Sequence, residues 1–404
     1  MPNKHYDVVV IGAGIQGAGV AQAAAAFGYK TLLIEKYPQA GMGTSCKSSK
    51  LIHGGLRYLE SGQFKLVREC LIERKRLLKN APHLVKLTPF YIPVYKNSLR
   101  PAWLIRLGLI IYSLFSFKLF SVVNKKHWRE LDDLKLKNLK MVFKYYDAQT
   151  DDKKLTQAVI KSAQKLGAEI IYDACFIKSF PPPTSKSTPR SITHLLSYEK
   201  NQRQHTTKCR CIINCSGPWV SQVQEKISPR LPVPDIELVA GTHIVIKRAT
   251  KCGIYYIEAS DKRAVFVMPW KDKSTLIGTT ERVYTGDAND IQPTENEINY
   301  LLAAYNKNFN SPIKHADIID SFAGLRVLPA SQQSAFNKPR ESLIIHNQTS
   351  PALVTIIGGK LTAYRASSEN VLNRIIKQLG KPDSLNTEKT DPHRNPGDTK
   401  DILL

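Results

Sequence analysis

The sequence predicts an α/β protein that carries a second, antiparallel sheet. Three observations support this fold class. Between residues 6 and 36, an apolar run, a glycine turn, an alanine-rich segment and another apolar run follow one another. A similar run, glycine turn and helical segment returns at residues 352–377. From Val239 onward, four short runs rich in β-branched and aromatic residues are separated by charged turns, which is typical of antiparallel strands.

The first unit, residues 6–36, has the features of a dinucleotide-binding strand, turn, helix and strand. Gly12 permits a tight turn, Gly14 lets the backbone approach a pyrophosphate, and Gly17 lets the helix pack closely. Glu35 ends the second strand about 20 residues beyond the turn, where an acid binds the hydroxyls of an unphosphorylated ribose. The unit therefore predicts a Rossmann-like domain that binds NAD or FAD, and it does not distinguish between them.

Length and charge narrow the function classes. A chain of 404 residues, 42% of them hydrophobic, is long enough for two domains with their own cores. The formal net charge of +24 predicts attraction to anions, such as a phosphorylated substrate or an anionic lipid surface. No nucleic-acid-binding motif accompanies the charge, so no nucleic-acid partner is expected.

The seven cysteines predict reduced thiols rather than disulfides. The first strand begins almost at the N-terminus, which leaves little room for a targeting peptide and favours a cytoplasmic protein. Cys209, Cys211 and Cys215 alternate along a strand-like run and lack a second pair of ligands. We expect them to pack in the core, and no metal site is predicted.

Residues 48–60 concentrate polar side chains around a pair of glycines. Gly54 and Gly55 would let the backbone pass close to a flat ligand, and His53 is the side chain here that titrates near neutral pH. A histidine that caps a turn made by the glycines explains the same pattern equally well.

Residues 99–123 are the most apolar part of the chain. A membrane-spanning helix needs about 20 apolar residues, and Arg106 and Lys118 interrupt this run. Trp103 and Tyr112, with basic residues on both sides, would suit a helix that lies in a membrane interface. A buried helix that covers the second domain is an equally good interpretation.

Two later segments end in small-residue turns. Residues 212–219 predict a strand that ends at Ser216, Gly217 and Trp219, the position at which a doubly wound sheet binds its ligand. Gly358 and Gly359 precede a helix whose N-terminus predicts a second site for an anion or a flavin.

Five segments, taken in order, resemble a known family: IGAGIQG at 11–17, SSKLIHGGLRYLE at 48–60, NCSGPWV at 214–220, FVMPW and IGTT within 266–280, and GGKLTAYR at 358–365. Together they resemble the FAD-dependent glycerol-3-phosphate dehydrogenases, in the D-amino-acid-oxidase-like flavoprotein superfamily. The resemblance extends to about residue 375 and implies that the cofactor is FAD. Members usually continue into a C-terminal helical domain, which this chain is expected to lack.

The resemblance implies a discontinuous FAD-binding domain and a substrate domain with an antiparallel sheet. The FAD-binding domain would comprise residues 1–95, 147–222 and 321–380. The substrate domain would comprise residues 96–146, an apolar helical segment, and residues 223–320. Residues 381–404 are polar and are expected to be a disordered tail.

The resemblance also implies a reaction, in which hydride passes from C2 of sn-glycerol 3-phosphate to flavin N5 and gives dihydroxyacetone phosphate. Arg326 and Arg340 would hold the phosphate. His53 would act as the general base, with His243 as its rival. Lys360 would stabilise the reduced flavin or contact substrate.

Arg57 and Tyr58 would line the same pocket. The cofactor-binding residues implied in this way are Gly12, Gly14, Gly17, Glu35, Ser48, Ser49, Lys50, Leu51, His53, Gly54, Ser216, Gly217, Trp219, Gly358, Gly359, Lys360, Leu361 and Thr362.

The implied partners are glycerol 3-phosphate, a membrane quinone, an anionic membrane surface on the cytoplasmic side and, as a further possibility, a second copy of the chain. Three alternatives stay open at this point. They are an oxidase that passes electrons to oxygen, an amine or amino-acid oxidase of the same superfamily, and a flavoprotein that has lost catalysis.

Overall fold

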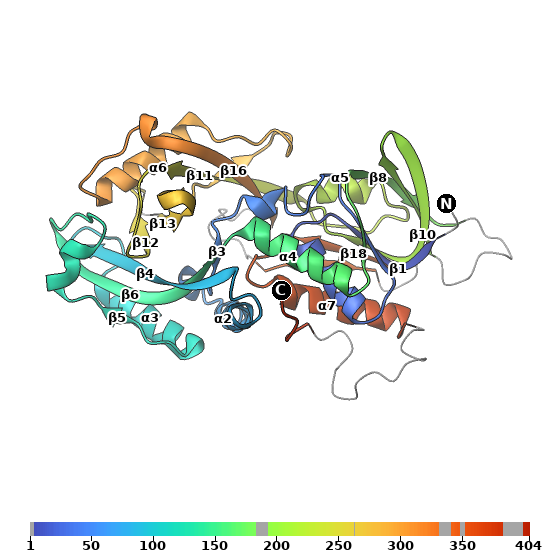
Figure 1. The fold of residues 1–404 in the computed structure, drawn as a ribbon, viewed down its shortest axis with the longest axis horizontal. Helices are drawn as coiled ribbons and strands as arrows, with labels where there is room; N and C mark the ends of the chain where they lie inside the picture. Colours follow the sequence, from blue (N-terminus) through green and yellow to red (C-terminus); the bar gives the residue numbers. More distant parts are fainter. Residues whose placement is uncertain (1–3, 183–192, 262, 331–340, 348–351, 383–398) are drawn as a thin grey trace.

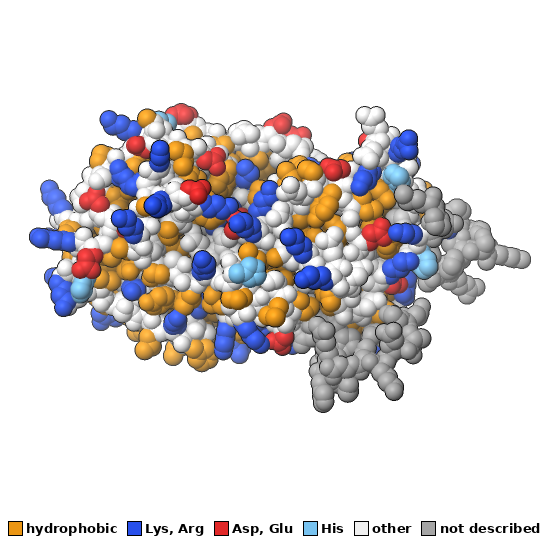
Figure 2. All heavy atoms as spheres, viewed as in Figure 1, with side chains coloured by type: hydrophobic (Ala, Val, Ile, Leu, Met, Phe, Trp, Pro, Cys, Tyr) orange, Lys and Arg blue, Asp and Glu red, His pale blue; other side chains and the backbone are white. Residues whose placement is uncertain are grey.

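The computed structural model describes residues 4–182, 193–261, 263–330, 341–347, 352–382 and 399–404. These residues form two sheets that lie side by side, each with its own hydrophobic clusters (Figure 1). Lys and Arg side chains are spread over the visible face of the molecule and do not gather in one patch (Figure 2).

The first sheet is the nucleotide-binding type that the glycine turn predicted. Its described strands run in the order β17 (Leu343–His346), β18 (Ala352–Ile357), β10 (Arg203–Asn214), β1 (His5–Ile11), β2 (Thr31–Ile34) and β7 (Glu169–Ile171). The pairs from β18 to β7 are parallel, whereas β17 is antiparallel to β18. An antiparallel extension, β8 (Ala174–Phe180) and β9 (His194–Lys200), pairs with β10.

Helices cover this sheet because its strands are apolar on both faces. On one face α1 (Ile15–Ala26) packs between α4 (Asp152–Lys165) and α7 (Tyr364–Leu379). The short α5 (Val220–Glu225) follows β10. The three predicted core cysteines, Cys209, Cys211 and Cys215, are buried as expected.

The second sheet confirms the antiparallel prediction. Its described strands run in the order β15 (Arg282–Tyr284), β11 (Ile236–Ile246), β14 (Ser274–Gly278), β13 (Ala264–Trp270), β12 (Ile254–Glu258), β4 (Val85–Tyr95), β6 (Leu139–Thr150) and β3 (Leu51–Ile52). β16 (Ile318–Pro329) pairs with β11, and β5 (Ser121–Val122) pairs with β6. Only β12 and β4 are parallel among the described pairs of this sheet.

Three helices flank the second sheet. α6 (Glu295–Asn308) packs on one face and begins with the predicted capping box, in which Thr294 and Glu297 satisfy each other's backbone N–H. α2 (Phe64–Asn80) and α3 (Ala102–Ser116) lie together on the other side (Figure 1). Short 3-10 helices occur at Thr44–Cys46, Leu56–Leu59, Lys125–Glu130, Gly217–Trp219, Lys271–Lys273 and His315–Asp317.

Four strands of the second sheet, β3, β4, β6 and β16, lie wholly or partly in residues that were predicted to belong to the first domain. β3 and β4 were expected in the first domain, and yet both belong to the second sheet. The reason is that β4 pairs with β6 along its whole length, from Val85 opposite Thr150 to Tyr95 opposite Leu139. β6 and β16 likewise continue beyond residues 146 and 320, because each remains hydrogen-bonded to its neighbour in the second sheet.

The predicted disordered tail needs a partial correction. Residues 383–398 lie outside the described part of the chain. Residues 399–404, however, pack against the end of α2, where the Asn80 Nδ2 donates to the Lys400 carbonyl at 2.6 Å. The Leu404 N–H donates to the Asn80 carbonyl at 2.9 Å and so satisfies a carbonyl at the C-terminal end of that helix.

Candidate active site

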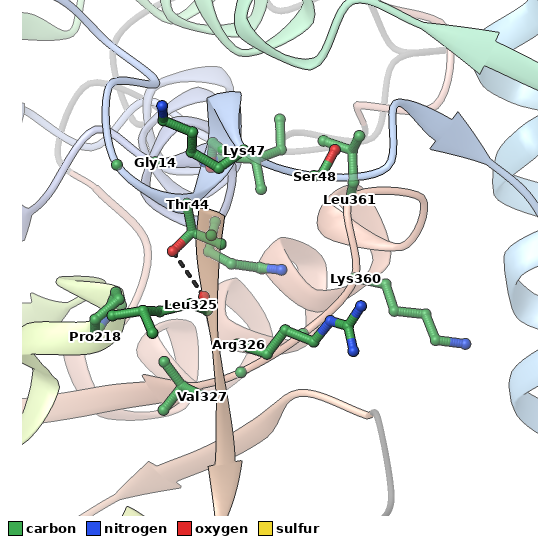
Figure 3. A pocket seen from close by; sticks show the side chains of 18 of the residues that line it. Gly14, Thr44, Lys47, Ser48, Pro218, Leu325, Arg326, Val327, Lys360 and Leu361 are labelled. Carbon is green, nitrogen blue, oxygen red and sulfur yellow. Dashed lines mark hydrogen bonds between the residues drawn. The ribbon is translucent and has the colours of Figure 1, made fainter. Parts of the chain in front are cut away.

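A cavity of about 520 Å³ runs between the two sheets. Its wall includes Gly12, Gly14 and Glu35 from the first sheet and its glycine turn, and Phe266 and Arg326 from the antiparallel sheet. Figure 3 shows segments from distant parts of the chain meeting at this cavity, with the Thr44 hydroxyl donating to the Leu325 carbonyl at 2.9 Å. The cavity is therefore built by both domains.

The glycine turn is shaped as the sequence predicted. Gly12 has a φ of +101°, and a Cβ on Gly17 would lie 1.9 Å from the Gly12 carbonyl oxygen. Gly17 does not line the cavity, because its role is to let α1 approach the turn. Glu35 is buried at the end of β2 and accepts a hydrogen bond from the Tyr37 N–H at 3.0 Å and another from the Ala13 N–H. Burial raises the pKa of this carboxyl, although the two N–H donors oppose the shift.

Two polar groups at the cavity wall are buried and have no hydrogen-bond partner within the part of the chain that the structure describes. They are the side-chain amide of Gln16 and the Nε1 of Trp219. Buried polar groups in native proteins are nearly always hydrogen-bonded, so both positions fit a ligand rich in donors and acceptors. The Trp219 ring also lies under the Lys36 ammonium, which is 3.4 Å from the ring centroid. Gln16 and Lys36 were not predicted, although each stands directly beside a predicted cofactor residue.

His53 and His243 both line the cavity, but their surroundings differ. The His53 N–H donates to the Thr362 Oγ1 at 3.1 Å, which ties this turn to the loop after β18. His243 is buried, stacks on Phe322 and has its Nε2 3.0 Å from the Ser49 Oγ. Burial lowers the pKa of His243 well below its usual value, and the nearby cations Lys50 and Arg326 lower it further. His243 therefore stays neutral at physiological pH.

Three cationic side chains also line the cavity, two of them beside the Tyr58 ring. Arg57, Arg326 and Lys360 all line it, as predicted, and Figure 3 shows the last two extending the same way from neighbouring segments. The Lys360 ammonium lies 3.6 Å from the ring centroid of Tyr58, and Arg57 lies 5.2 Å from it. This region has the charge needed to bind an anion such as a phosphate.

The antiparallel sheet adds two charged residues that sequence reasoning missed, Arg263 and Glu281. The Glu281 carboxylate pairs with Arg326 at 3.2 Å, and its backbone carbonyl accepts from Arg263 at 3.3 Å. Neither residue lies in a glycine-rich or otherwise distinctive run. The signal that was available for Glu281 was its place directly after the IGTT segment.

Most of the other predicted cofactor residues also line the cavity: Ser48, Ser49, Leu51, Ser216, Gly217, Gly358, Gly359, Leu361 and Thr362. Gly54 and Lys50 do not. The Lys50 ammonium instead forms a buried ion pair with the Asp152 carboxylate at 2.7 Å, so its prediction as a cofactor ligand is corrected. Arg340 lies outside the described residues, and its role stays a prediction.

Comparison with known proteins now identifies the family. The family model for DAO, described as FAD dependent oxidoreductase, matches residues 7–365. The chain belongs to this family. FAD is accordingly its cofactor, and the glycine turn, Glu35, Gln16 and Trp219 line the cavity that would hold it.

Individual relatives support the resemblance to glycerol-3-phosphate dehydrogenases. The aerobic glycerol-3-phosphate dehydrogenase of Escherichia coli is 37% identical over 380 residues, which are 91% of this chain and 73% of that protein. The D-erythritol 1-phosphate dehydrogenase of Brucella abortus is 34% identical over 93% of this chain and 75% of its own length. The crystal structure of the Bacillus halodurans glycerol-3-phosphate dehydrogenase complexed with FAD matches with a TM-score of 0.72 at 26% identity. That match covers 94% of this chain and 66% of the other.

The buried pair of Lys50 and Asp152 generates a prediction about stability. Asp152→Asn leaves the Lys50 ammonium buried without its counter-ion, so we expect the free energy of unfolding to fall by about 3–5 kcal/mol. Urea denaturation at a fixed FAD concentration measures this change. Asp401→Asn, which removes the partner of Lys79 in an exposed pair, is the control and should leave the unfolding midpoint unchanged. Equal midpoints for the two variants would contradict the structural role of the buried pair.

Proposed function

We propose that the protein oxidises sn-glycerol 3-phosphate to dihydroxyacetone phosphate, with FAD accepting hydride at N5. One observation supports this proposal above the others: His53, Arg57, Arg326 and Lys360 all line the cavity that fits the cofactor. The substrate needs a base at its C2 hydroxyl and cations around its phosphate, and this cavity offers both. The names of the relatives at 35% and 37% identity agree with it.

In this proposal the chain's own residues bind and orient the substrate. Arg326 and Arg57 hold the phosphate, because a planar guanidinium donates two hydrogen bonds to neighbouring phosphate oxygens. His53 takes the proton from the C2 hydroxyl as hydride leaves C2. His243 is less suited to that task, because a base works best with a pKa near the working pH. Lys360 supplies positive charge beside the reacting groups.

The substrate is tested by anaerobic titration of the FAD-loaded protein. Glycerol 3-phosphate should bleach the flavin absorbance, since hydride transfer reduces the ring and no oxygen is present to reoxidise it. Bleaching by D-erythritol 1-phosphate alone would assign the chain to the activity of its Brucella abortus relative. An unchanged spectrum with both phosphates, and bleaching with an amino acid, would refute the proposal.

The phosphate-binding role of Arg326 predicts a selective loss of substrate affinity. Arg326→Ala removes a charge-assisted interaction worth about 1.5–3 kcal/mol, so half-reduction should need roughly 10 to 100 times more glycerol 3-phosphate. FAD content should match that of the wild type. If the variant lost FAD and kept its substrate affinity, Arg326 would belong to the cofactor site instead.

The proposed base generates a second prediction. His53→Ala should keep FAD and slow flavin reduction by roughly 10²- to 10⁴-fold, the usual loss when a general base is removed. Stopped-flow absorbance at saturating substrate measures the rate. His243→Asn, the matched variant, should slow it far less. The reverse order of the two effects would make His243 the base.

The electron acceptor in this proposal is a quinone in an anionic membrane, which the protein meets on its cytoplasmic side through α3. No helix among the described residues has the length and apolar content needed to cross a bilayer. Along α3, however, Trp103, Leu107, Ile110 and Leu114 recur at helical spacing and are 67%, 48%, 45% and 68% exposed. Such a stripe suits a helix that lies in a membrane interface.

The chain continues this surface beyond the helix. Phe117 and Leu119 are 90% and 84% exposed, and the basic side chains of Arg106, Lys118 and Lys125 are exposed beside them. Each basic residue near an anionic bilayer contributes about 1 kcal/mol. Figure 2 shows hydrophobic and basic side chains together along the lower edge, where Figure 1 places α3. A homodimer, implied by the family resemblance, stays a prediction.

If α3 binds the membrane, a variant that lacks its exposed apolar side chains should no longer sediment with vesicles. The double variant Leu114→Ser, Phe117→Ser should leave most of the protein in the supernatant after centrifugation with vesicles that contain anionic phosphatidylglycerol. Ile319→Ser on β16, which removes a side chain that is 56% exposed, is the control and should sediment as the wild type does. If the double variant also sedimented fully, α3 would not be the docking surface.

A further inference from the structure

The turn that carries His53 is held from two sides by hydroxyl groups. Its first amide, the His53 N–H, donates to the Thr362 Oγ1 at 3.1 Å, from the FAD-binding side of the cavity. Its next amide, the Gly54 N–H, donates to the Tyr112 hydroxyl at 2.9 Å, from α3. The two donors are consecutive backbone N–H groups with acceptors on different elements. Together the two hydrogen bonds fix the peptide unit between His53 and Gly54.

The Tyr112 hydroxyl is itself fixed by a buried polar chain. It donates to the Asp147 Oδ2 at 2.7 Å, and the same carboxylate forms a buried ion pair with Arg74. Arg74 also donates to the Tyr146 carbonyl at 2.9 Å. An ionised carboxylate only accepts hydrogen bonds, so the single Tyr112 proton points to Asp147 and its oxygen accepts from Gly54. Burial raises the pKa of Tyr112 well above its usual value, and the Asp147 carboxylate raises it further, which keeps the proton on the phenol.

Close packing leaves the turn little freedom. A Cβ on Gly54 would lie 2.7 Å from the Tyr112 hydroxyl oxygen and 2.8 Å from the Leu71 side chain, so the backbone rests directly on α2 and α3. Gly55 then takes a left-handed φ of +80°, and the chain bends around the ring of Tyr58. The Gly54 backbone, next to His53, is thus held by α2 and α3, while Thr362 at the cavity wall holds the His53 N–H.

Tyr112 does not line the cavity, whereas His53 does. We propose that Tyr112 is a positioning residue for His53, which sets the height and direction of the imidazole through the Gly54 amide. This inference rests on the proposed function, because it takes His53 as the base. In this proposal α3 has two roles. Its exposed apolar face binds the membrane, and its buried face holds the turn through Tyr112.

The expected effect is larger on the rate than on binding. Without the hydroxyl, the Gly54 N–H loses its bond to Tyr112 and keeps only its interaction with the Asp147 carboxylate, so the turn can shift. Displacement of a catalytic group by about 1 Å costs up to about 10²-fold in rate. Arg326 and Lys360 come from other segments, whereas Arg57 follows the turn directly, so substrate affinity should change less than the rate.

Tyr112→Phe tests the proposal, and Tyr255→Phe is its matched control. Tyr112→Phe keeps the ring, and with it the edge contact to Tyr145, so the variant should fold. Tyr255, on β12, is also buried, and its hydroxyl donates to the Asp132 Oδ2 at 2.9 Å, away from the cavity. Each variant deletes one buried hydroxyl that donates to a carboxylate, and only Tyr112 contacts the turn that carries His53.

Two readouts are measured on the FAD-loaded proteins. Hydrogen–deuterium exchange of the peptide that contains Gly54, without substrate, should quicken at least tenfold in Tyr112→Phe and stay unchanged in Tyr255→Phe. The limiting rate of flavin reduction should fall 10- to 100-fold in Tyr112→Phe alone, a larger factor than any rise in the half-saturating substrate concentration, at unchanged FAD content.

Three results would overturn the proposal: unchanged exchange in Tyr112→Phe, quicker exchange with a wild-type reduction rate, or an equal loss of rate in both variants. Failure of the proposed function would give a different result from failure of the role of Tyr112. In that case the wild-type flavin is not reduced by glycerol 3-phosphate, while the exchange measurement still decides whether Tyr112 holds the turn.

Discussion

The close approach of neighbouring segments to a few glycines is the constraint on which the cavity depends. A Cβ on Gly12 would lie 2.8 Å from the Cys215 carbonyl oxygen, and one on Gly359 would lie 2.5 Å from the Gln16 amide nitrogen. These contacts bring the ends of β1, β10 and β18 together at one edge of the first sheet. Parallel strands place their C-terminal ends at the same edge, and there the chain can surround a dinucleotide.

Buried charge organises the boundary between the two sheets. Asp152 at the start of α4 pairs with Lys50, and Asp147 on β6 pairs with Arg74 on α2. Each pair joins segments that are about 100 or about 70 residues apart in the sequence. A buried ion is costly without its partner, so these pairs fix how the segments before and after β3 sit against their neighbours. The positions of Ser48 and Ser49 at the cavity wall follow from that arrangement.

Local signals predicted local structure well. The strand, turn and helix at residues 6–36, the capping box at Thr294 and the change to antiparallel strands all appear in the structure. Sequence reasoning was weaker where the structure depends on which distant segments pair with one another. It placed β4 with the first domain, since an isolated strand does not reveal which sheet it joins. It made Lys50 a cofactor ligand, since the motif shows a cation and not the Asp152 that neutralises it.

By itself, the sequence determined the dinucleotide-binding unit and the change to antiparallel strands, because glycine conformation, strand propensity and helix capping act over a few residues. Only the tertiary structure decided which side chains meet. It joined His53 to Thr362 and Tyr112, buried His243 in a site that keeps it neutral, and brought Arg263 and Glu281 to the cavity from the far sheet. Burial and electrostatic environment depend on packing between distant segments, and no local pattern records that packing.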